Sequence, residues 1–245
     1  MEEESWKTRT KLLLEDEAIN KLSKAKILVI GLGGVGAYAA EMLCRAGIGN
    51  LHIIDNDTIS ASNINRQLLA LKSSIGKSKV QLMKARLLDI NPELKLKTEE
   101  VYITYDILND ILDKDYDYII DAIDTIAPKI GILEYAINTN IPIISSMGSG
   151  GKTNPALIQI ADFSETYNDR LARAIRKRLH KRGINNGFKV VFSPEQINPL
   201  ALKIIENESN KKNTVGTISY MPAIFGSFMA AEVIRSIGEI KDFKY

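Results

Sequence analysis

Four glycines that follow a short apolar run are the first residues of this chain with a recognisable chemical use. The run covers residues 27–30, and three of the glycines then stand at GxGxxG spacing. Such a turn between a strand and a helix directs backbone N–H groups and a helix N-terminus at a phosphate. We therefore expect a phosphate-binding turn at this point of the chain. The glycines are Gly31, Gly33, Gly34 and Gly36.

Two aspartates follow the next apolar run, at residues 51–54. Asp55 stands about 20 residues beyond the turn, where a carboxylate can accept hydrogen bonds from ribose hydroxyls. Glycines placed between two apolar runs and followed by an acid are far more specific than glycines alone. Residues 26–57 therefore predict a βαβ unit that binds a nucleotide, with Asp55 and Asp57 as further candidate ligands.

Polar and cationic residues after the second run indicate which nucleotide is bound. The segment SNINRQ supplies Asn63, Arg66 and Gln67, and Lys77 and Lys79 follow it. An NAD domain has no special need for Arg and Lys beside its second strand. A triphosphate does, because its charge must be countered as a bond to phosphorus breaks. We therefore expect ATP rather than NAD.

Two further acids, Asp121 and Asp124, stand near the end of a later apolar run. Mg²⁺ takes one or two carboxylates and completes its shell with phosphate oxygens and water. The pair therefore suits a magnesium ion that accompanies ATP.

The spacing of apolar residues predicts alternating strands and helices, and hence a doubly wound, mostly parallel α/β sheet of Rossmann type. Ligands of such sheets lie beyond the carboxyl ends of the strands, where Asp55, Asp124 and Ser146 fall. Helices are expected over residues 15–24, 37–44, 78–90, 106–112 and 129–138, and strands over residues 27–30, 51–54, 94–103, 116–123 and 141–145.

Beyond residue 150 the pattern is looser. We expect strands near residues 156–161 and 189–193 and an apolar helix over residues 218–237. The chain is expected to form one domain over residues 1–245, with a nucleotide-binding half at about 25–147 and a second half at about 148–245.

Residues 170–182 carry seven Arg and Lys side chains and no acid. Leu171, Ala174, Ile175 and Leu179 form a stripe that can pack down and leave the cations outward. Such a face suits a phosphate backbone and predicts salt-sensitive binding to nucleic acid. The candidate contacts are Arg173, Arg176, Lys177 and Lys181.

The single cysteine, Cys44, excludes an internal disulfide and a cysteine-built zinc site. It lies on the apolar face of the first predicted helix, so we expect a buried structural thiol. The N-terminus is charged and has no apolar signal region. The apolar stretch at 218–237 contains Pro222, Gly226 and Glu232, which favours a buried helix over a membrane anchor. We expect a cytoplasmic protein without a membrane segment.

The motifs GLGGVG, DND, SNINRQ, GKSKV and DAID together resemble the ThiF/MoeB/ubiquitin-activating (E1-like) superfamily over about the first 150 residues. The resemblance implies that ATP and Mg²⁺ adenylate a carboxylate and release pyrophosphate. It also implies that Asp55 holds the ribose, that Asn63, Arg66 and Lys79 contact the phosphates, and that Asp124 places Mg²⁺. Arg66, Lys79 and Asp124 are thereby the expected catalytic residues.

In that superfamily an arginine near the N-terminus reaches the ATP site of a partner subunit. Arg9 is the candidate here, with Lys11 as its competitor. The resemblance therefore implies a homodimer, formed through the C-terminal half and the N-terminal arm.

The second half resembles the tRNA threonylcarbamoyladenosine dehydratase subgroup, through the segments DRLARAIRKRLHKRGI, GFKVVFSPE and VGTISYMPAIFG. This resemblance implies ATP-dependent dehydration (cyclisation) of N6-threonylcarbamoyladenosine in tRNA, with tRNA bound by the second half. It also admits a cysteine desulfurase-type partner. One alternative is adenylation of the C-terminal glycine of a sulfur-carrier protein, as in ThiF-type and MoeB-type enzymes. A second alternative, from a different class, is a non-catalytic nucleotide-binding or oxidoreductase-like module.

Overall fold

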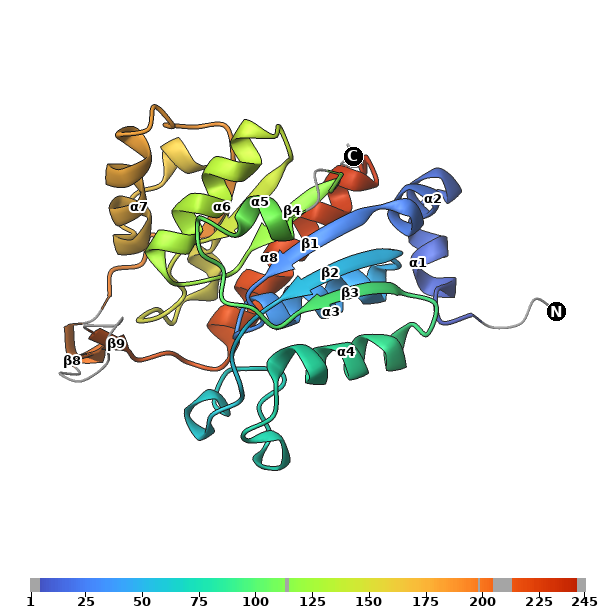
Figure 1. Ribbon diagram of the computed structural model, residues 1–245, viewed down its shortest axis with the longest axis horizontal. Helices are drawn as coiled ribbons and strands as arrows, with labels where there is room; N and C mark the ends of the chain where they lie inside the picture. The colour runs from blue at the N-terminus through green and yellow to red at the C-terminus, as the bar shows by residue number, and fades with distance from the viewer. Residues whose placement is uncertain (1–4, 113–114, 198, 205–212, 242–245) are drawn as a thin grey trace.

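The computed structural model describes residues 5–112, 115–197, 199–204 and 213–241. Its centre is a seven-stranded sheet in the order β3-β2-β1-β4-β5-β7-β6 (Figure 1). All neighbouring strands pair in parallel except β6 and β7, which are antiparallel. The predicted mostly parallel, doubly wound α/β fold is therefore confirmed. The strands are β1 (Lys26–Ile30), β2 (Asn50–Ile54), β3 (Lys95–Glu99), β4 (Tyr118–Asp121), β5 (Ile143–Ser146), β6 (Gln159–Asp162) and β7 (Lys189–Phe192).

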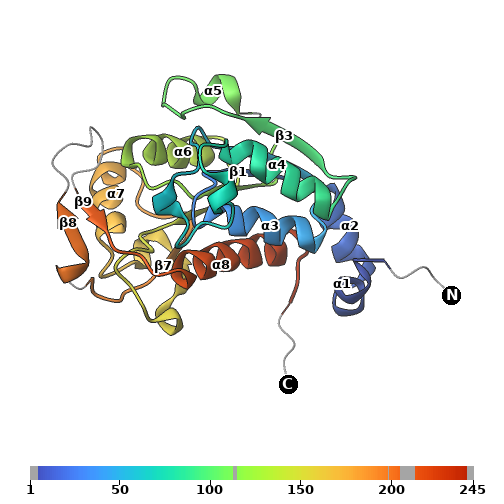
Figure 2. The same cartoon turned by 90° about the horizontal axis from the view of Figure 1, so that it is seen from below.

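Helices cover both faces of the sheet. On one face α3, α4 and α8 lie side by side (Figure 2), and on the other lie α5, α6 and α7. The helices are α1 (Thr8–Leu13), α2 (Asp16–Lys24), α3 (Gly36–Ala46), α4 (Lys79–Ile90), α5 (Leu108–Ile111), α6 (Ile126–Asn138), α7 (Arg170–His180) and α8 (Tyr220–Ile237).

Two strands end earlier than the sequence predicts, each level with the end of a neighbouring strand. The strand expected over residues 94–103 stops at Glu99, which pairs with Ile54, the last residue of β2. The strand expected over 116–123 stops at Asp121, opposite Ile30, the last residue of β1, although β5 on its other side continues to Ser146. Both predictions were therefore too long.

Three parts of the secondary structure were not predicted or were predicted as a different type. The short helix α1 was not predicted, and neither was the two-stranded pair β8 (Leu202–Ile204) and β9 (Asn213–Val215). Residues 155–157, expected at the start of a strand, form a single 3₁₀ turn before β6. β6 lies at the edge of the sheet and pairs in the antiparallel direction with β7, which follows it in sequence after α7.

The apolar helix α8 is buried against α3 rather than exposed to a bilayer. A Cβ built at Gly226 would lie 2.3 Å from Val35 O, so the two helices approach at this glycine. Met221, Phe225 and Met229 are completely buried on the contacting face. Within the described ranges, none of the helices combines the length and apolar character that a membrane span requires.

Candidate nucleotide and nucleic-acid site

The glycine turn lies at the carboxyl ends of β1 and β4. Gly31 has φ +91°, and a Cβ there would lie 2.9 Å from Ile123 Cγ2. A Cβ at Gly36 would lie 1.8 Å from Gly31 O, and one at Gly34 would lie 3.0 Å from Pro222 Cβ. At Gly33 the nearest atom, Gln67 Nε2, is 3.9 Å away. Three of the glycines therefore allow close packing, while Gly33 leaves space for a ligand.

The helix that follows the turn also suits a phosphate. α3 has no side-chain hydrogen bond at its N-cap, Val35. Its first N–H groups carry the positive end of the helix dipole toward the carboxyl edge of the sheet. The glycine turn is thus present where the sequence predicts it, with an open glycine and an uncapped helix beside it.

Asp55 fixes the glycine turn through hydrogen bonds and lies at the edge of the sheet where a nucleotide is expected. Its Oδ2 accepts from Leu32 N at 2.6 Å, within the turn, and its Oδ1 accepts from Asp57 N at 2.7 Å. Burial raises the pKa of Asp55 above its usual value, although Lys79 and the two N–H donors act in the opposite direction. Because each carboxylate oxygen has two lone pairs, Asp55 can hold the turn and still accept from ribose hydroxyls.

Lys79 is buried at the start of α4, beside both aspartates. Its Nζ lies 2.7 Å from Asp57 Oδ2 and 3.9 Å from Asp55 Oδ1. Ser78 caps the helix by accepting from Gln81 N. The structure therefore brings together Lys79 and the acids of DND, a grouping that sequence spacing alone did not reveal.

The segment SNINRQ forms a compact loop next to the turn. Asn63 Oδ1 accepts from Ser60 N, and Arg66 Nη1 donates to Ser62 O and Asn65 Oδ1. Gln67 Oε1 is buried without a hydrogen-bond partner in the structure. An orphaned acceptor beside Gly33 indicates a site that a ligand or water completes.

The two acids after β4 have different environments. Asp121 is completely buried; its Oδ2 accepts from Lys129 Nζ at 2.6 Å and from Ser145 Oγ at 2.7 Å. The prediction that Asp121 helps to hold Mg²⁺ is therefore wrong, because its carboxylate serves an internal ion pair. Asp124 is exposed at the same edge and fits a ligand that shares Mg²⁺ with phosphate oxygens. In the part of the chain that the structure describes, no cluster of three or more His, Cys, Asp or Glu could hold a metal by itself.

Lys129 is a buried charge that sequence reasoning missed. It donates to Ile123 O at 2.9 Å as well as to Asp121, and Asp121 Oδ1 accepts from Ile123 N. The ion pair thus fixes the backbone immediately before Asp124. The available signal was a lone lysine in the apolar helix sequence IAPKIGILEYAIN.

Cys44 is fully buried, as expected. Its Sγ lies 3.5 Å from Leu87 O, and burial raises the pKa of the thiol from 9.0 to about 11. A protonated thiol in the core is a poor nucleophile. Cys44 is therefore structural.

Arg9 lies far from the glycine turn of its own chain. The neighbouring Lys7 side chain lies 3.8 Å from the position of a Cβ at Gly47, which ends α3. The glycine turn is at the other end of α3, a helix about 16 Å long. Figure 1 shows α1 at the end of the molecule opposite α7. Arg9 therefore does not reach the nucleotide site of its own chain. A role for Arg9 in the site of a partner subunit requires this separation.

The basic helix α7 packs its apolar stripe inward, with Ala172, Ile175 and Leu179 buried. Arg173, Lys177 and Lys181 are exposed. Arg176 is different: its Nη2 donates to Thr166 O at 2.7 Å and to Thr166 Oγ1, and the guanidinium lies over the Phe163 ring. The expectation that every cation of this helix points outward is wrong for Arg176, because it anchors the loop before the helix.

The basic helix begins at the same edge of the sheet as the nucleotide turn. Its N-cap Asp169 lies 3.7 Å from the position of a Cβ at Gly148, just after β5. A nucleic acid bound along α7 thus lies next to the loops that follow the parallel strands.

A parallel sheet with a glycine turn after β1 and a buried acid after β2 defines a nucleotide-binding α/β protein. Within that class, the chain matches the ThiF family over residues 8–245 and belongs to it. It is 37% identical over 246 residues to a Bacillus subtilis protein named tRNA threonylcarbamoyladenosine dehydratase, covering 97% of this chain and 95% of that protein. It is 38% identical to the Haemophilus influenzae protein of the same name, covering 92% of this chain and 90% of that one.

A solved structure agrees with these sequence matches. The crystal structure of E. coli tRNA N6-threonylcarbamoyladenosine dehydratase, TcdA, in complex with ATP superposes with a TM-score of 0.86. The two chains are 31% identical, and the match covers 97% of this chain and 96% of the other. The resemblance expected from the sequence motifs is therefore confirmed.

Proposed function

We propose that this chain catalyses ATP-dependent dehydration of N6-threonylcarbamoyladenosine in tRNA by adenylating the threonyl carboxylate. The observation that carries the proposal is the shared edge of the sheet, which holds both the glycine turn after β1 and the start of the basic helix beside Gly148. Similarity over nearly the full length to proteins that carry this name supports it.

ATP would supply the adenylyl group that activates the carboxylate. The backbone N–H groups of the glycine turn and α3 would bind its phosphates, with Gly33 giving the closest approach. Arg66 and Lys79 would neutralise phosphate charge, and Asp55 would orient the ribose. Asn63 would also contact the phosphates, and Gln67, whose Nε2 is the atom nearest to a Cβ at Gly33, would border the site. No nucleophile from the enzyme is needed, because the threonylcarbamoyl side chain attacks its own activated carboxylate.

Mg²⁺ would be held by Asp124 together with phosphate oxygens. Its exposed position after β4 suits this role, and the Asp121–Lys129 pair fixes the segment that carries it. Arg173, Lys177 and Lys181 would contact the tRNA backbone, while Arg176 keeps the preceding loop in place.

The assembly belongs to the same proposal. Residues 1–245 would act as one ThiF-type domain that forms a homodimer in the cytoplasm, with Arg9 reaching the partner's nucleotide. The half at about 148–245 would supply both the tRNA surface and dimer contacts. A cysteine desulfurase-type protein is a further proposed partner.

The test is conversion of tRNA by the purified protein. Modified tRNA, ATP and Mg²⁺ are incubated with the enzyme, and the nucleosides are analysed by mass spectrometry. We expect the modified adenosine to lose one water, with AMP and pyrophosphate formed in equal amounts. Unmodified tRNA and the Asp124→Asn variant are the controls.

The carrier-protein alternative predicts a different outcome. If the protein adenylates the C-terminal glycine of a sulfur carrier and leaves the modified tRNA unchanged, the proposal is wrong. Nucleosides from a deletion strain provide the same test in cells, because they should retain the uncyclised form.

A further inference from the structure

A third buried lysine, Lys152, lies outside the candidate nucleotide and tRNA contacts. Its side chain is 1% exposed, as is that of its partner Asp169. Lys152 Nζ donates to Asp169 Oδ2 at 2.7 Å and to Ser193 O at 2.6 Å. One ammonium therefore joins the loop after β5, the N-cap of α7 and the end of β7.

Asp169 is central to how α7 begins. Its Oδ1 accepts from Ala172 N at 2.9 Å and caps the helix, while Oδ2 is held by Lys152. The capping group of the basic helix is thus itself fixed by a side chain from the ligand edge of the sheet. Moving Lys152 would shift the first turn of α7 against the strands.

The residues that follow Lys152 are tied to other segments of the same edge. Thr153 N and Asn154 N both donate to the Glu195 carboxylate, and Tyr220 Oη donates to Thr153 O. Burial of Glu195 opposes its ionisation, but these donors prevail and hold its pKa below the usual range.

The connection continues to the nucleotide turn. Tyr220 is the first residue of α8, and Pro222 in the same turn of α8 lies 3.0 Å from the position of a Cβ at Gly34. A short chain of direct contacts therefore runs from the cap of α7 through residues 152–154 to the glycine turn.

We propose that Lys152 is a positioning residue that holds the RNA-binding helix in register with the nucleotide site. This inference rests on the proposed function. With the helix fixed, tRNA bound along α7 presents the threonyl carboxylate of its modified adenosine to the α-phosphate of ATP. Without the Lys152–Asp169 ion pair, tRNA and ATP still bind, but they are displaced relative to each other.

The test separates positioning from stability. Lys152→Met keeps the length of the side chain and removes its charge, which leaves Asp169 buried and unpaired and lowers stability. The double variant Lys152→Met/Asp169→Asn removes both charges and keeps a good N-cap, so stability should recover. We measure thermal unfolding, ATP affinity, and kcat and KM for modified tRNA.

For both variants we expect ATP affinity to equal that of the wild type. The kcat/KM for tRNA should fall by at least about tenfold, since small displacements of reacting groups cost this much or more. The decisive result is the double variant, which should regain stability without regaining kcat/KM. A double variant with wild-type stability and wild-type kcat/KM would show that the pair is only structural.

Glu41→Gln is the matched control. Glu41 is a buried carboxylate of α3 paired with Arg45 and Arg86, away from α7. It should lose stability with no change in kcat/KM for tRNA below its unfolding temperature.

Hydrogen exchange on the wild type tests the same coupling without any variant. Binding of tRNA should slow exchange of the amides of residues 151–154, and unchanged exchange there would overturn the inference. A wild-type enzyme that leaves modified tRNA unconverted would instead count against the proposed function.

Discussion

Lys79 Nζ donates to Asp57 Oδ2 over 2.7 Å, although the Lys79 side chain is 6% exposed and that of Asp57 is 59% exposed. The Lys79 ammonium is buried and held in one position, and the Asp57 carboxylate that holds it is exposed to solvent. Such a preorganised cation can stabilise developing phosphate charge without reorganising during the reaction.

Replacement of Lys79 should therefore affect both fold and activity. We expect Lys79→Ala to reduce turnover by at least about 100-fold and to lower the free energy of unfolding by about 1–3 kcal/mol, because Asp55 loses its cation. Steady-state kinetics and denaturant unfolding measure the two effects. The control is Lys84→Ala, an exposed lysine on α4, which should change neither. Equal effects at both positions would contradict the role of Lys79.

Two glycines of the turn should respond differently to alanine. Gly33→Ala should fold, because the nearest atom to its Cβ is 3.9 Å away, but the methyl group should weaken ATP binding. Gly36→Ala should fail to fold stably, because its Cβ would lie 1.8 Å from Gly31 O. Calorimetric titration with ATP and thermal unfolding distinguish them. Normal ATP affinity in the Gly33→Ala protein would show that the phosphates of ATP bind elsewhere.

Asp124→Asn should impair the magnesium-dependent step while leaving the fold intact. The change removes a charge from an exposed side chain, so stability should change by less than about 0.5 kcal/mol. Turnover should fall by at least about 100-fold, and more Mg²⁺ should be needed for half-maximal rate. Asp89→Asn, an exposed acid on α4, is the control. Near-normal turnover of Asp124→Asn would refute the assignment of Mg²⁺ to this residue.

Cys44→Ala should retain catalysis and should alter how stability depends on pH. Because burial raises the folded pKa of the thiol from 9.0 to about 11, its stabilising contribution is complete below pH 9 and is lost as pH rises through 11. The stability advantage of the wild type over the variant should thus shrink by about 1 kcal/mol between pH 8 and pH 10.

Denaturant unfolding at the two pH values measures this difference. A constant difference would mean that the thiol does not titrate in this range. A folded but inactive Cys44→Ala protein would instead indicate covalent chemistry at the cysteine.

The exposed cations of α7 should control the salt dependence of tRNA binding. The triple variant Arg173→Ala/Lys177→Ala/Lys181→Ala should flatten the log–log salt slope by about one unit for each cation that pairs with a phosphate in the wild type. ATP affinity should not change.

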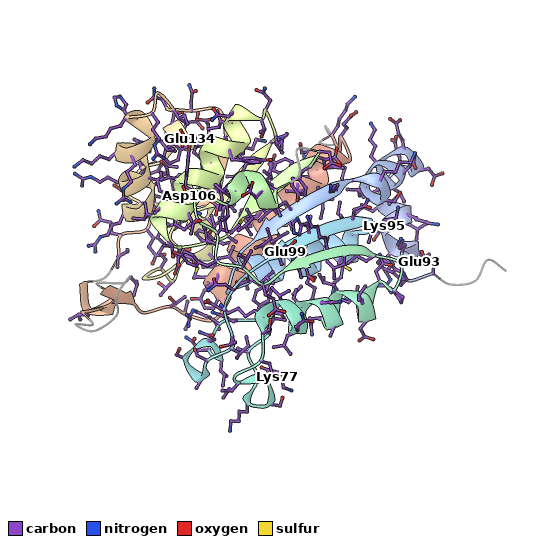
Figure 3. The ribbon with its side chains drawn as sticks, in the orientation of Figure 1. Lys77, Glu93, Lys95, Glu99, Asp106 and Glu134 are labelled. Atoms are coloured by element: carbon purple, nitrogen blue, oxygen red, sulfur yellow. The ribbon has the colours of Figure 1, made fainter. Side chains whose placement is uncertain are left out.

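The control removes the same charge elsewhere, at Lys24, Lys84 and Lys95, of which Lys95 begins β3 far from α7 (Figure 3). Arg176→Ala should behave differently from both, losing stability because its partners Thr166 and Phe163 are internal. A triple variant with an unchanged slope would make α7 an ordinary solvated surface.

Features that depend on local spacing could be predicted from the order of the residues alone. The glycine turn and the strands on either side of it follow from residues that are neighbours in the chain, and they folded as expected at Gly31–Gly36 and Asp55. The same holds for Cys44, whose place on an apolar helix face predicted its burial.

Which charged groups are buried and paired depends on how elements distant in the chain pack together. Lys129 meets Asp121, Lys152 meets Asp169 and Ser193, and Arg176 meets Thr166 because separate elements pack against one another. A lone lysine in an apolar helix sequence, as at Lys129, can indicate burial, but the local pattern does not say which strand or loop supplies its partner. The edge of the sheet that carries the proposed ATP ligands and the start of the basic helix likewise depends on strand order, which brings together residues far apart in the chain.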